Sequence, residues 1–146
     1  MNVRPFISAG ISAVLLVALL CHSVFALEPG IETYGKDKNG ARHVNATEAA
    51  EILKKYPTVQ VLDVRTEKEY KRGHISDSIN IDYHGSQFKK QLDKLDRNTT
   101  WLVHCHSGVR SGRSLGILKS LGFKSIIHLD GGALAWTEAK QPLQKN

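Results

Sequence analysis

The sequence is poor in cysteine. Two of its 146 residues are cysteines, Cys21 and Cys105. Cys21 lies in an N-terminal segment that we expect to be removed, so the mature chain keeps Cys105 alone. One cysteine forms no internal disulfide, which excludes a disulfide-stapled secreted domain and a Cys-x-x-Cys oxidoreductase. A lone thiol in an oxidising compartment is a liability unless it is used, so Cys105 is a candidate functional residue.

The sequence also lacks internal repeats and long runs of one charge. The absence of repeats in a chain of this length favours one domain. The formal net charge is +6, but the basic residues are scattered and form nothing longer than pairs such as Lys54-Lys55 and Lys89-Lys90. The net positive charge favours small anionic ligands. Scattered pairs are typical of solvated helix faces, so we expect no nucleic-acid partner.

One long apolar run stands at the N-terminus. Residues 7–20 are almost uninterruptedly apolar, Arg4 precedes them, and Val24-Phe25-Ala26 ends in a small residue. These are the three regions of a secretory signal peptide. We expect cleavage after Ala26 and a periplasmic or secreted protein. The alternative is an uncleaved anchor, which needs about 20 apolar residues and would be the protein's contact with a membrane.

Short apolar strands alternate with helical patterns after this segment. The predicted strands are 42–44, 59–64, 78–81, 101–104 and 125–129. The predicted helices begin at a cap, Asn45 or Thr47, and run to 55, then over 67–71 after Thr66, 85–95, 111–121 and 132–140. This alternation predicts an α/β fold, a doubly wound, mostly parallel five-stranded sheet with helices on both faces.

The expected organisation of the chain follows from these patterns. Residues 1–26 are the signal peptide, 27–41 an N-terminal arm, 42–140 the domain and 141–146 a C-terminal tail. We expect the protein to be a monomer.

Cys105 is placed where a reactive thiol is expected. It follows the apolar run Trp101-Leu102-Val103 and precedes a helical pattern that begins near Ser111. Backbone N–H groups converge in a tight loop at a helix N-terminus, which stabilises a thiolate and binds an anion. Ligands of parallel sheets also bind at the carboxyl ends of strands. The implied chemistry is a nucleophilic sulfur that acts on a small oxyanion.

Three separated motifs resemble those of the rhodanese-like domain family, over about residues 42 to 137. They resemble the family's amino-side signature, active-site loop and carboxy-side signature. In order, they are Leu62-Asp63-Val64-Arg65 with Glu69-Tyr70, Gly73-His74-Ile75 and Ile79-Asn80-Ile81; Cys105-His106-Ser107-Gly108-Val109-Arg110-Ser111; and Leu129-Asp130-Gly131-Gly132 with Ala135-Trp136. The chain departs from the pattern at Ser76-Asp77-Ser78, where the family commonly has a smaller Gly-Ala pair. Three motifs in order make a specific signal.

The resemblance implies a transferase of the thiosulfate sulfurtransferase, or rhodanese, type. Cys105 is then the catalytic residue, which receives a sulfane sulfur from thiosulfate or a related donor and carries it as a persulfide. The acceptor is cyanide or a thiol. No cofactor is expected.

The loop residues support this chemistry independently. Loop N–H groups and the helix dipole lower a thiol pKa from its free value of about 8.5, and Gly108 permits the sharp turn that aims those groups inward. Arg110 supplies a permanent charge suited to thiosulfate oxygens, although it would alternatively pin the loop through its carbonyls. The expected substrate-binding residues are His106, Ser107, Gly108, Val109 and Arg110, supported by Asp63, Arg65 and Ser111.

No metal site is expected at the cysteine. His104 and His106 flank Cys105, but alternation along a strand points both imidazoles away from the thiol. His104 is expected to pack against a neighbour. Asp63 and Arg65 are expected to organise the fold through an ion pair or a helix cap.

Two other functions fit a cysteine in an anion-binding loop. A phosphatase or arsenate reductase places five residues between the cysteine and the arginine, whereas four separate Cys105 from Arg110. No acidic residue lies nearby in the sequence to protonate a leaving group. A non-catalytic sulfur carrier or binding module would use the same loop to deliver a persulfide to a protein partner, and the loop sequence does not separate it from an enzyme.

Overall fold

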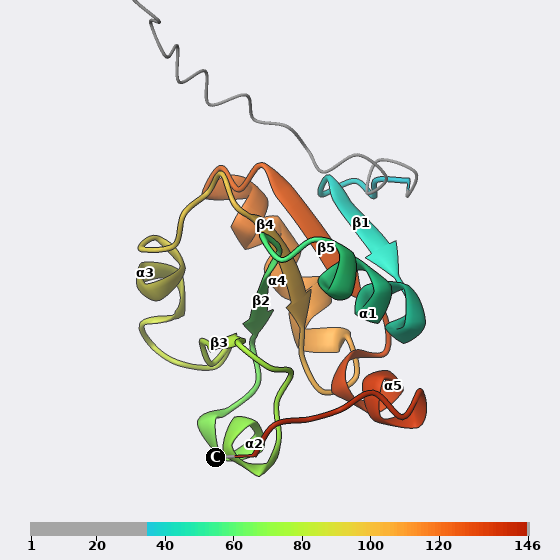
Figure 1. Ribbon diagram of the computed structural model, residues 1–146. Coiled ribbons are helices and arrows are strands. Elements are labelled where there is room, and N and C mark those ends of the chain that lie inside the picture. The colour runs from blue at the N-terminus through green and yellow to red at the C-terminus, as the bar shows by residue number, and fades with distance from the viewer. Residues whose placement is uncertain (1–34, 146) are drawn as a thin grey trace, which may run out of the picture.

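The computed structural model describes residues 35–145. Strands and helices alternate throughout these residues (Figure 1). The predicted signal peptide, its cleavage site and the first part of the arm lie outside the described residues. The elements are β1 (Ala41–Val44), α1 (Ala46–Lys55), β2 (Gln60–Asp63), α2 (Glu67–Arg72), β3 (Ile79–Asn80), α3 (Phe88–Leu92), β4 (Thr100–His104), α4 (Val109–Ser120), β5 (Ser125–Leu129) and α5 (Gly132–Glu138).

The five strands form one sheet in the order β1-β5-β4-β2-β3, and every neighbouring pair is parallel. The expected five-stranded parallel α/β fold is confirmed. The carboxyl ends of the strands share one edge, so the residues that follow β2, β4 and β5 lie near one another. The register of β1 against β5 sets His43 opposite His128.

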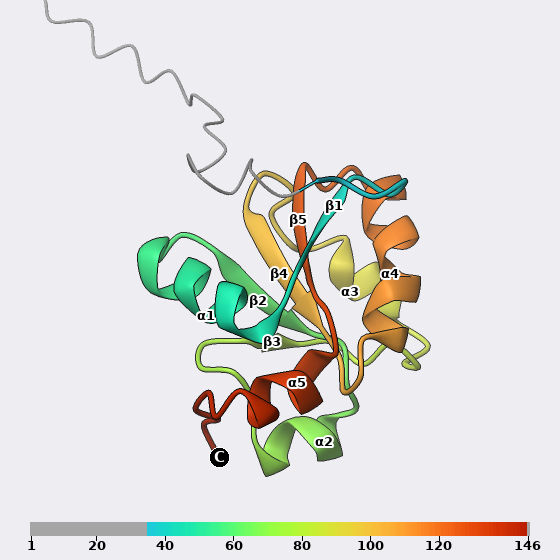
Figure 2. The same cartoon turned by 90° about the vertical axis from the view of Figure 1, so that its right-hand side faces the viewer.

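Helices cover both faces of the sheet (Figure 2). The apolar residues of α1 and α5 pack with Val61, Leu102 and Ile127 on one face. The apolar residues of α3 and α4 pack with side chains such as Leu62 and Val103 on the other. Since successive strand residues point to opposite faces, continuous apolar strands such as β4 fill both cores.

Local capping signals place the early helices. Asn45 caps α1 and Thr66 caps α2, each in a capping box with the glutamate three residues later, Glu48 and Glu69. Such a box satisfies two backbone N–H groups that the helix leaves without partners. Both helices therefore begin where the sequence predicts.

All three later helices differ from their predicted bounds. Helix α5 ends at Glu138, two residues before the predicted end at residue 140. Helix α4 begins at Val109 instead of Ser111, because Gly108 takes a left-handed conformation, with φ of 90°, and starts the helix directly after it. Helix α3 has five residues, fewer than the predicted span 85–95. Among residues 35–145, no helix is long and apolar enough to cross a bilayer.

The segment after α5 returns along the molecule to the residues that follow α2. Gln144 forms an antiparallel bridge with His74 through two backbone hydrogen bonds of 2.9 and 2.8 Å. The Trp136 indole N–H donates to the Pro142 carbonyl at 2.9 Å.

Candidate active site

The loop between β4 and α4 carries Cys105. Its Sγ accepts a hydrogen bond from the Gly108 backbone N–H at 3.2 Å and lies 3.5 Å from the Ser111 hydroxyl oxygen. Gly108 makes this arrangement possible, because its positive φ turns the backbone back toward the sulfur. The loop surrounds the sulfur with donors from the first turn of α4.

The surroundings of Cys105 favour the thiolate. The residue is 1% exposed, and burial by itself raises the pKa of a thiol. The Ser111 hydroxyl and the backbone N–H groups of Ser111, Ser107 and Gly108 outweigh that burial, so the pKa of Cys105 is lowered. A thiolate is the nucleophilic form of cysteine, and the site is therefore built for nucleophilic sulfur.

The start of α5 holds the loop from the other side. The backbone N–H groups of Ala133 and Leu134 donate to the Cys105 and His106 carbonyls, at 2.8 and 2.9 Å. This approach requires glycine at position 132, because its φ is 58° and a Cβ there would collide with the Cys105 and His106 carbonyl oxygens. The carboxy-side motif thus acts structurally, by fixing the carbonyls of the cysteine loop.

Arg110 is paired with a residue from α2. Its Nη1 and Nη2 donate to the two carboxylate oxygens of Glu69, at 2.8 and 2.6 Å. These bonds hold the pKa of Glu69 far below its usual range against the effect of burial, and Thr66 adds to the lowering. The guanidinium also interacts with the Cys105 sulfur, which contributes to the raised pKa of Arg110. Glu69 and Cys105 thus share the charge of Arg110.

Asp63 and Arg65 position α2. Arg65 donates through Nε and Nη2 to the buried Asp63 carboxylate, with distances of 2.6 to 3.0 Å, and through Nη2 to the Gly73 carbonyl. The Asn80 amide donates to the carbonyls of both residues. The expected ion pair is present; it joins β2 to both ends of α2, and so fixes the helix that supplies Glu69.

Sequence reasoning missed a second polar cluster, which reaches the sulfur through Ser111. The Ser111 hydroxyl is hydrogen-bonded to His128 Nε2 at 2.8 Å. His128 Nδ1 and His43 Nδ1 both donate to Asp130 Oδ1, at 2.9 and 2.7 Å. His43 lies in β1, His128 lies in β5, and Asp130 directly follows β5. Their only sequence signal is the opposition of two histidines across parallel strands, and this requires the strand order.

The remaining predicted residues are distributed around the loop. His106, Ser107 and Val109 are exposed, and Gly108 is half-buried. His104 is fully buried at the end of β4, with its Nδ1 3.1 Å from the Cys105 carbonyl oxygen. Burial lowers the pKa of His104, so the ring is neutral and structural at neutral pH. Among the described residues, the hydrogen bonds to Cys105 Sγ come from the Ser111 hydroxyl and the loop amides, and neither neighbouring histidine supplies one.

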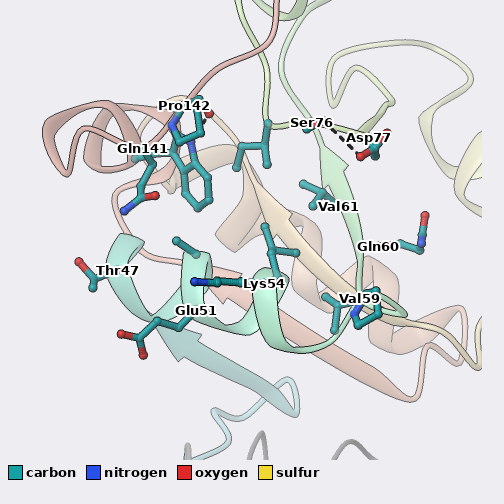
Figure 3. Close-up of a pocket in the computed structure, with 15 residues that line it drawn as sticks. Thr47, Glu51, Lys54, Val59, Gln60, Val61, Ser76, Asp77, Gln141 and Pro142 are labelled. Atoms are coloured by element: carbon teal, nitrogen blue, oxygen red, sulfur yellow. Dashed lines mark hydrogen bonds between the residues drawn. The ribbon is translucent and has the colours of Figure 1, made fainter.

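A hollow elsewhere on the molecule is separate from this site. It has a volume of about 780 Å³ and lies between α1, β2 and the segment after α5 (Figure 3). Val59 and Val61 contribute to its apolar wall, and Glu51 and Lys54 lie at its margin. None of its lining residues is a cysteine or a histidine, and none belongs to the Cys105 loop. The nucleophile and the hollow therefore occupy different parts of the fold.

The comparisons with known proteins agree with the geometry. The family model of the rhodanese-like domain matches residues 45–139. The chain belongs to the rhodanese-like domain family. A crystal structure of a rhodanese-related protein from Thermoplasma volcanium has 32% sequence identity and a TM-score of 0.64, covering 72% of this chain and 99% of that one. The rhodanese-like fold is thus shown by sequence and by structure.

Two curated relatives carry more specific names. Thiosulfate sulfurtransferase 18 of Arabidopsis thaliana is 33% identical over 96 residues, which cover 58% of this chain and 71% of that protein. Putative sulfur carrier protein YrkF of Bacillus subtilis is 32% identical over 80 residues, which cover 55% of this chain and 42% of that protein. The matches to two further relatives cover only 55% and 61% of the length of those proteins. The relatives of this chain thus include one protein named as a sulfurtransferase and one named as a putative sulfur carrier.

Proposed function

We propose that this protein is a sulfurtransferase that moves a sulfane sulfur from thiosulfate, or a related donor, to cyanide or a thiol through a persulfide on Cys105. The observation that carries the proposal is the ring of donors around Cys105 Sγ, which lowers the pKa of a buried thiol. The matched family includes a protein named as a thiosulfate sulfurtransferase.

The first step is an attack by the Cys105 thiolate on the outer sulfur of thiosulfate. A new S–S bond forms to Cys105, the S–S bond within thiosulfate breaks, and sulfite leaves with the electron pair. Arg110 binds the sulfonate oxygens of the donor in this proposal. A guanidinium has five N–H donors, and the two bonds to Glu69 leave three that can serve the Cys105 sulfur and the oxygens of the donor.

The second step returns the enzyme to its starting state. Cyanide or a thiolate attacks the outer sulfur of the persulfide, the Cys–S bond to that sulfur breaks, and Cys105 leaves as thiolate. The same loop N–H groups stabilise the persulfide anion and the released thiolate. With cyanide, the product is thiocyanate. No cofactor or external electron takes part.

A sulfur carrier is the second candidate. It is favoured by the similarity to YrkF, which is named a putative sulfur carrier. The two functions differ in turnover. An enzyme forms many thiocyanate molecules per protein, whereas a carrier without its partner stops after about one. Counting thiocyanate per protein over time separates them.

A phosphatase or arsenate reductase is disfavoured by the site. Four residues separate Cys105 from Arg110, and the carboxylate near the loop, Glu69, is held ionised by Arg110. An ionised carboxylate has no proton to give to a leaving group. We expect negligible hydrolysis of a small aryl phosphate.

The proposed cellular place is the periplasm or the exterior, after cleavage behind Ala26. The support is the sequence pattern of residues 4–26. N-terminal sequencing of protein recovered from the cell envelope is expected to begin at Leu27. An intact Met1 in a membrane fraction would favour the anchor.

The activity is tested by steady-state thiosulfate–cyanide kinetics. Wild-type protein is expected to form thiocyanate over many turnovers, and Cys105→Ser to form none while its Tm stays nearly unchanged. Substantial thiocyanate formation by a folded Cys105→Ser variant would contradict the persulfide mechanism.

A further inference from the structure

Three side chains converge beside the cysteine loop in a pattern that the sulfur chemistry does not use. His43 Nδ1 and His128 Nδ1 lie 3.4 Å apart. Both lie within 2.9 Å of the same oxygen, Asp130 Oδ1. All three atoms lie within 4.8 Å of one another. We call these residues the His43–His128–Asp130 cluster.

The spacing fits the ligands of a tetrahedral metal ion. Zn²⁺ binds imidazole nitrogen and carboxylate oxygen at about 2.0–2.2 Å, which sets neighbouring ligand atoms roughly 3.3–3.6 Å apart in a tetrahedron. The two imidazole nitrogens already have this separation. The carboxylate contacts are shorter because they are hydrogen bonds, and the exposed Asp130 side chain needs to retreat only about half an ångström to admit an ion.

The outer nitrogens of both imidazoles also have partners. His43 Nε2 lies 3.5 Å from Asp37 Oδ2, and His128 Nε2 is hydrogen-bonded to the Ser111 hydroxyl. A histidine that binds a metal through one nitrogen characteristically uses the other to contact a carboxylate or another acceptor, which fixes the ring. Asp37 is itself held by the backbone N–H groups of Asn39 and Ala41.

The cluster combines a rigid base with an open side. His43 and His128 face each other across paired strands β1 and β5, so their backbones cannot drift apart. The His43 and Asp130 side chains are 39% and 53% exposed, whereas that of His128 is 6% exposed. An ion can therefore enter from solvent, and a water molecule can complete a coordination sphere with three protein ligands.

We propose that His43, His128 and Asp130 form a binding site for a divalent transition-metal ion, with Zn²⁺ as the best-fitting ion. The site is independent of the persulfide mechanism. It adjoins the reactive sulfur, because Ser111 contacts both His128 Nε2 and Cys105 Sγ. A test must therefore prevent Cys105 from acting as the ligand instead.

The experiment is a calorimetric titration of the Cys105→Ser protein with ZnCl₂, paired with the absorption spectrum of the Co²⁺ form. We expect one ion per chain and a tetrahedral Co²⁺ spectrum without a sulfur band. His43→Ala and Asp130→Asn, each added to Cys105→Ser, are expected to weaken binding at least about tenfold, since even loss of an outer partner costs 10–100-fold. Asp37→Asn is expected to weaken it by about tenfold.

The controls separate this site from other ways of binding metal. His84→Ala in the same background removes an exposed histidine outside the cluster and should leave affinity unchanged. Far-UV spectra and Tm values check that each variant is folded. Equal affinity in folded His43→Ala and Asp130→Asn variants would overturn the proposal. So would binding by wild-type protein that disappears in Cys105→Ser, because the thiol would then be the ligand.

Discussion

The Cys105 loop has two flanks of different electrostatic character. On one flank, Arg110 and Glu69 form a two-pronged ion pair whose charges are fixed at neutral pH. On the other, the Ser111 hydroxyl is hydrogen-bonded to His128, which is hydrogen-bonded in turn to Asp130. The first flank supplies constant charge for an anion. The second places a further hydrogen-bond partner, His128, beside the Ser111 hydroxyl that faces the sulfur.

Ser111 shows how the second flank acts. Its hydroxyl has one hydrogen but three acceptors within reach: Cys105 Sγ, the Gly108 carbonyl and His128 Nε2. A neutral His128 that donates from Nδ1 to Asp130 accepts at Nε2 and competes with the sulfur for that hydrogen. Arg110 also has two partners, Glu69 and Cys105, but its five N–H groups are enough for both.

The largest expected effect comes from Gly132, which supports both flanks. Gly132→Ala places a methyl group against the Cys105 and His106 carbonyls at a φ of 58°. Strain and overpacking together are expected to lower the free energy of unfolding by at least about 3 kcal/mol. Chemical denaturation measures it. Gly112→Ala, where a Cβ meets nothing within 4 Å, is the control, and an equal loss in both variants would refute the close-packing argument.

Arg110→Ala is expected to weaken apparent affinity for thiosulfate by about 1–3 kcal/mol, mainly through KM, and less at high salt. Part of this loss arises because the unpaired Glu69 carboxylate repels the dianion. The double variant Arg110→Ala/Glu69→Gln should recover that part. Arg110→Lys keeps the charge without the planar fork, so it should recover only some affinity. A fall in kcat and Tm with no KM or salt effect would instead show that Arg110 only holds the loop.

The Glu69 pair should also contribute to stability in a defined pH range. The folded-state pKa of Glu69 is depressed, so its contribution is present above the unfolded value of about 4.3 and is lost as pH falls below it. Glu69→Gln is expected to lower the free energy of unfolding at pH 7 by about 1–3 kcal/mol, with the difference shrinking toward acid. Glu67→Gln, at an exposed ion pair with Lys71, is the matched control. A pH-independent difference would contradict this account.

The smallest effect is expected on the flank that contains Ser111 and His128. Ser111→Ala removes one of the donors that lower the pKa of Cys105 against burial, so the thiol pKa should rise by about one unit. The pH dependence of alkylation by iodoacetamide measures it. Ser120→Ala, which removes an exposed hydroxyl from the same helix, should leave the profile unchanged. An unchanged profile in Ser111→Ala would mean that the backbone donors suffice.

The sequence predicted the parts of this molecule that depend on neighbours in the chain. Asn45 and Thr66 were predictable caps, because a capping box spans only four residues. Cys105, Gly108 and Ser111 lie within seven consecutive residues, so a single turn into α4 brings them together. The alternation of short strands with helices along the chain was also sufficient to predict the parallel sheet.

The rest depends on contacts between distant segments. Glu69 meets Arg110 across 41 positions, and His43 meets Asp130 across 87. No local pattern records such a pairing, because it is set by the order and register of the strands. The predicted start of α4 was two residues too late, for a different reason. The left-handed Gly108 begins the helix, while the sequence prediction used Gly108 only as part of a turn.

In the proposed mechanism Cys105 carries the transferred sulfur, and the intact mass of the protein reports whether it does. After thiosulfate treatment and removal of excess reagent, the wild-type mass is expected to rise by one sulfur atom, which fragmentation places on Cys105. Cyanide should then restore the original mass and release one thiocyanate per protein. A wild-type mass that does not change, or the same gain in Cys105→Ser, would contradict the account.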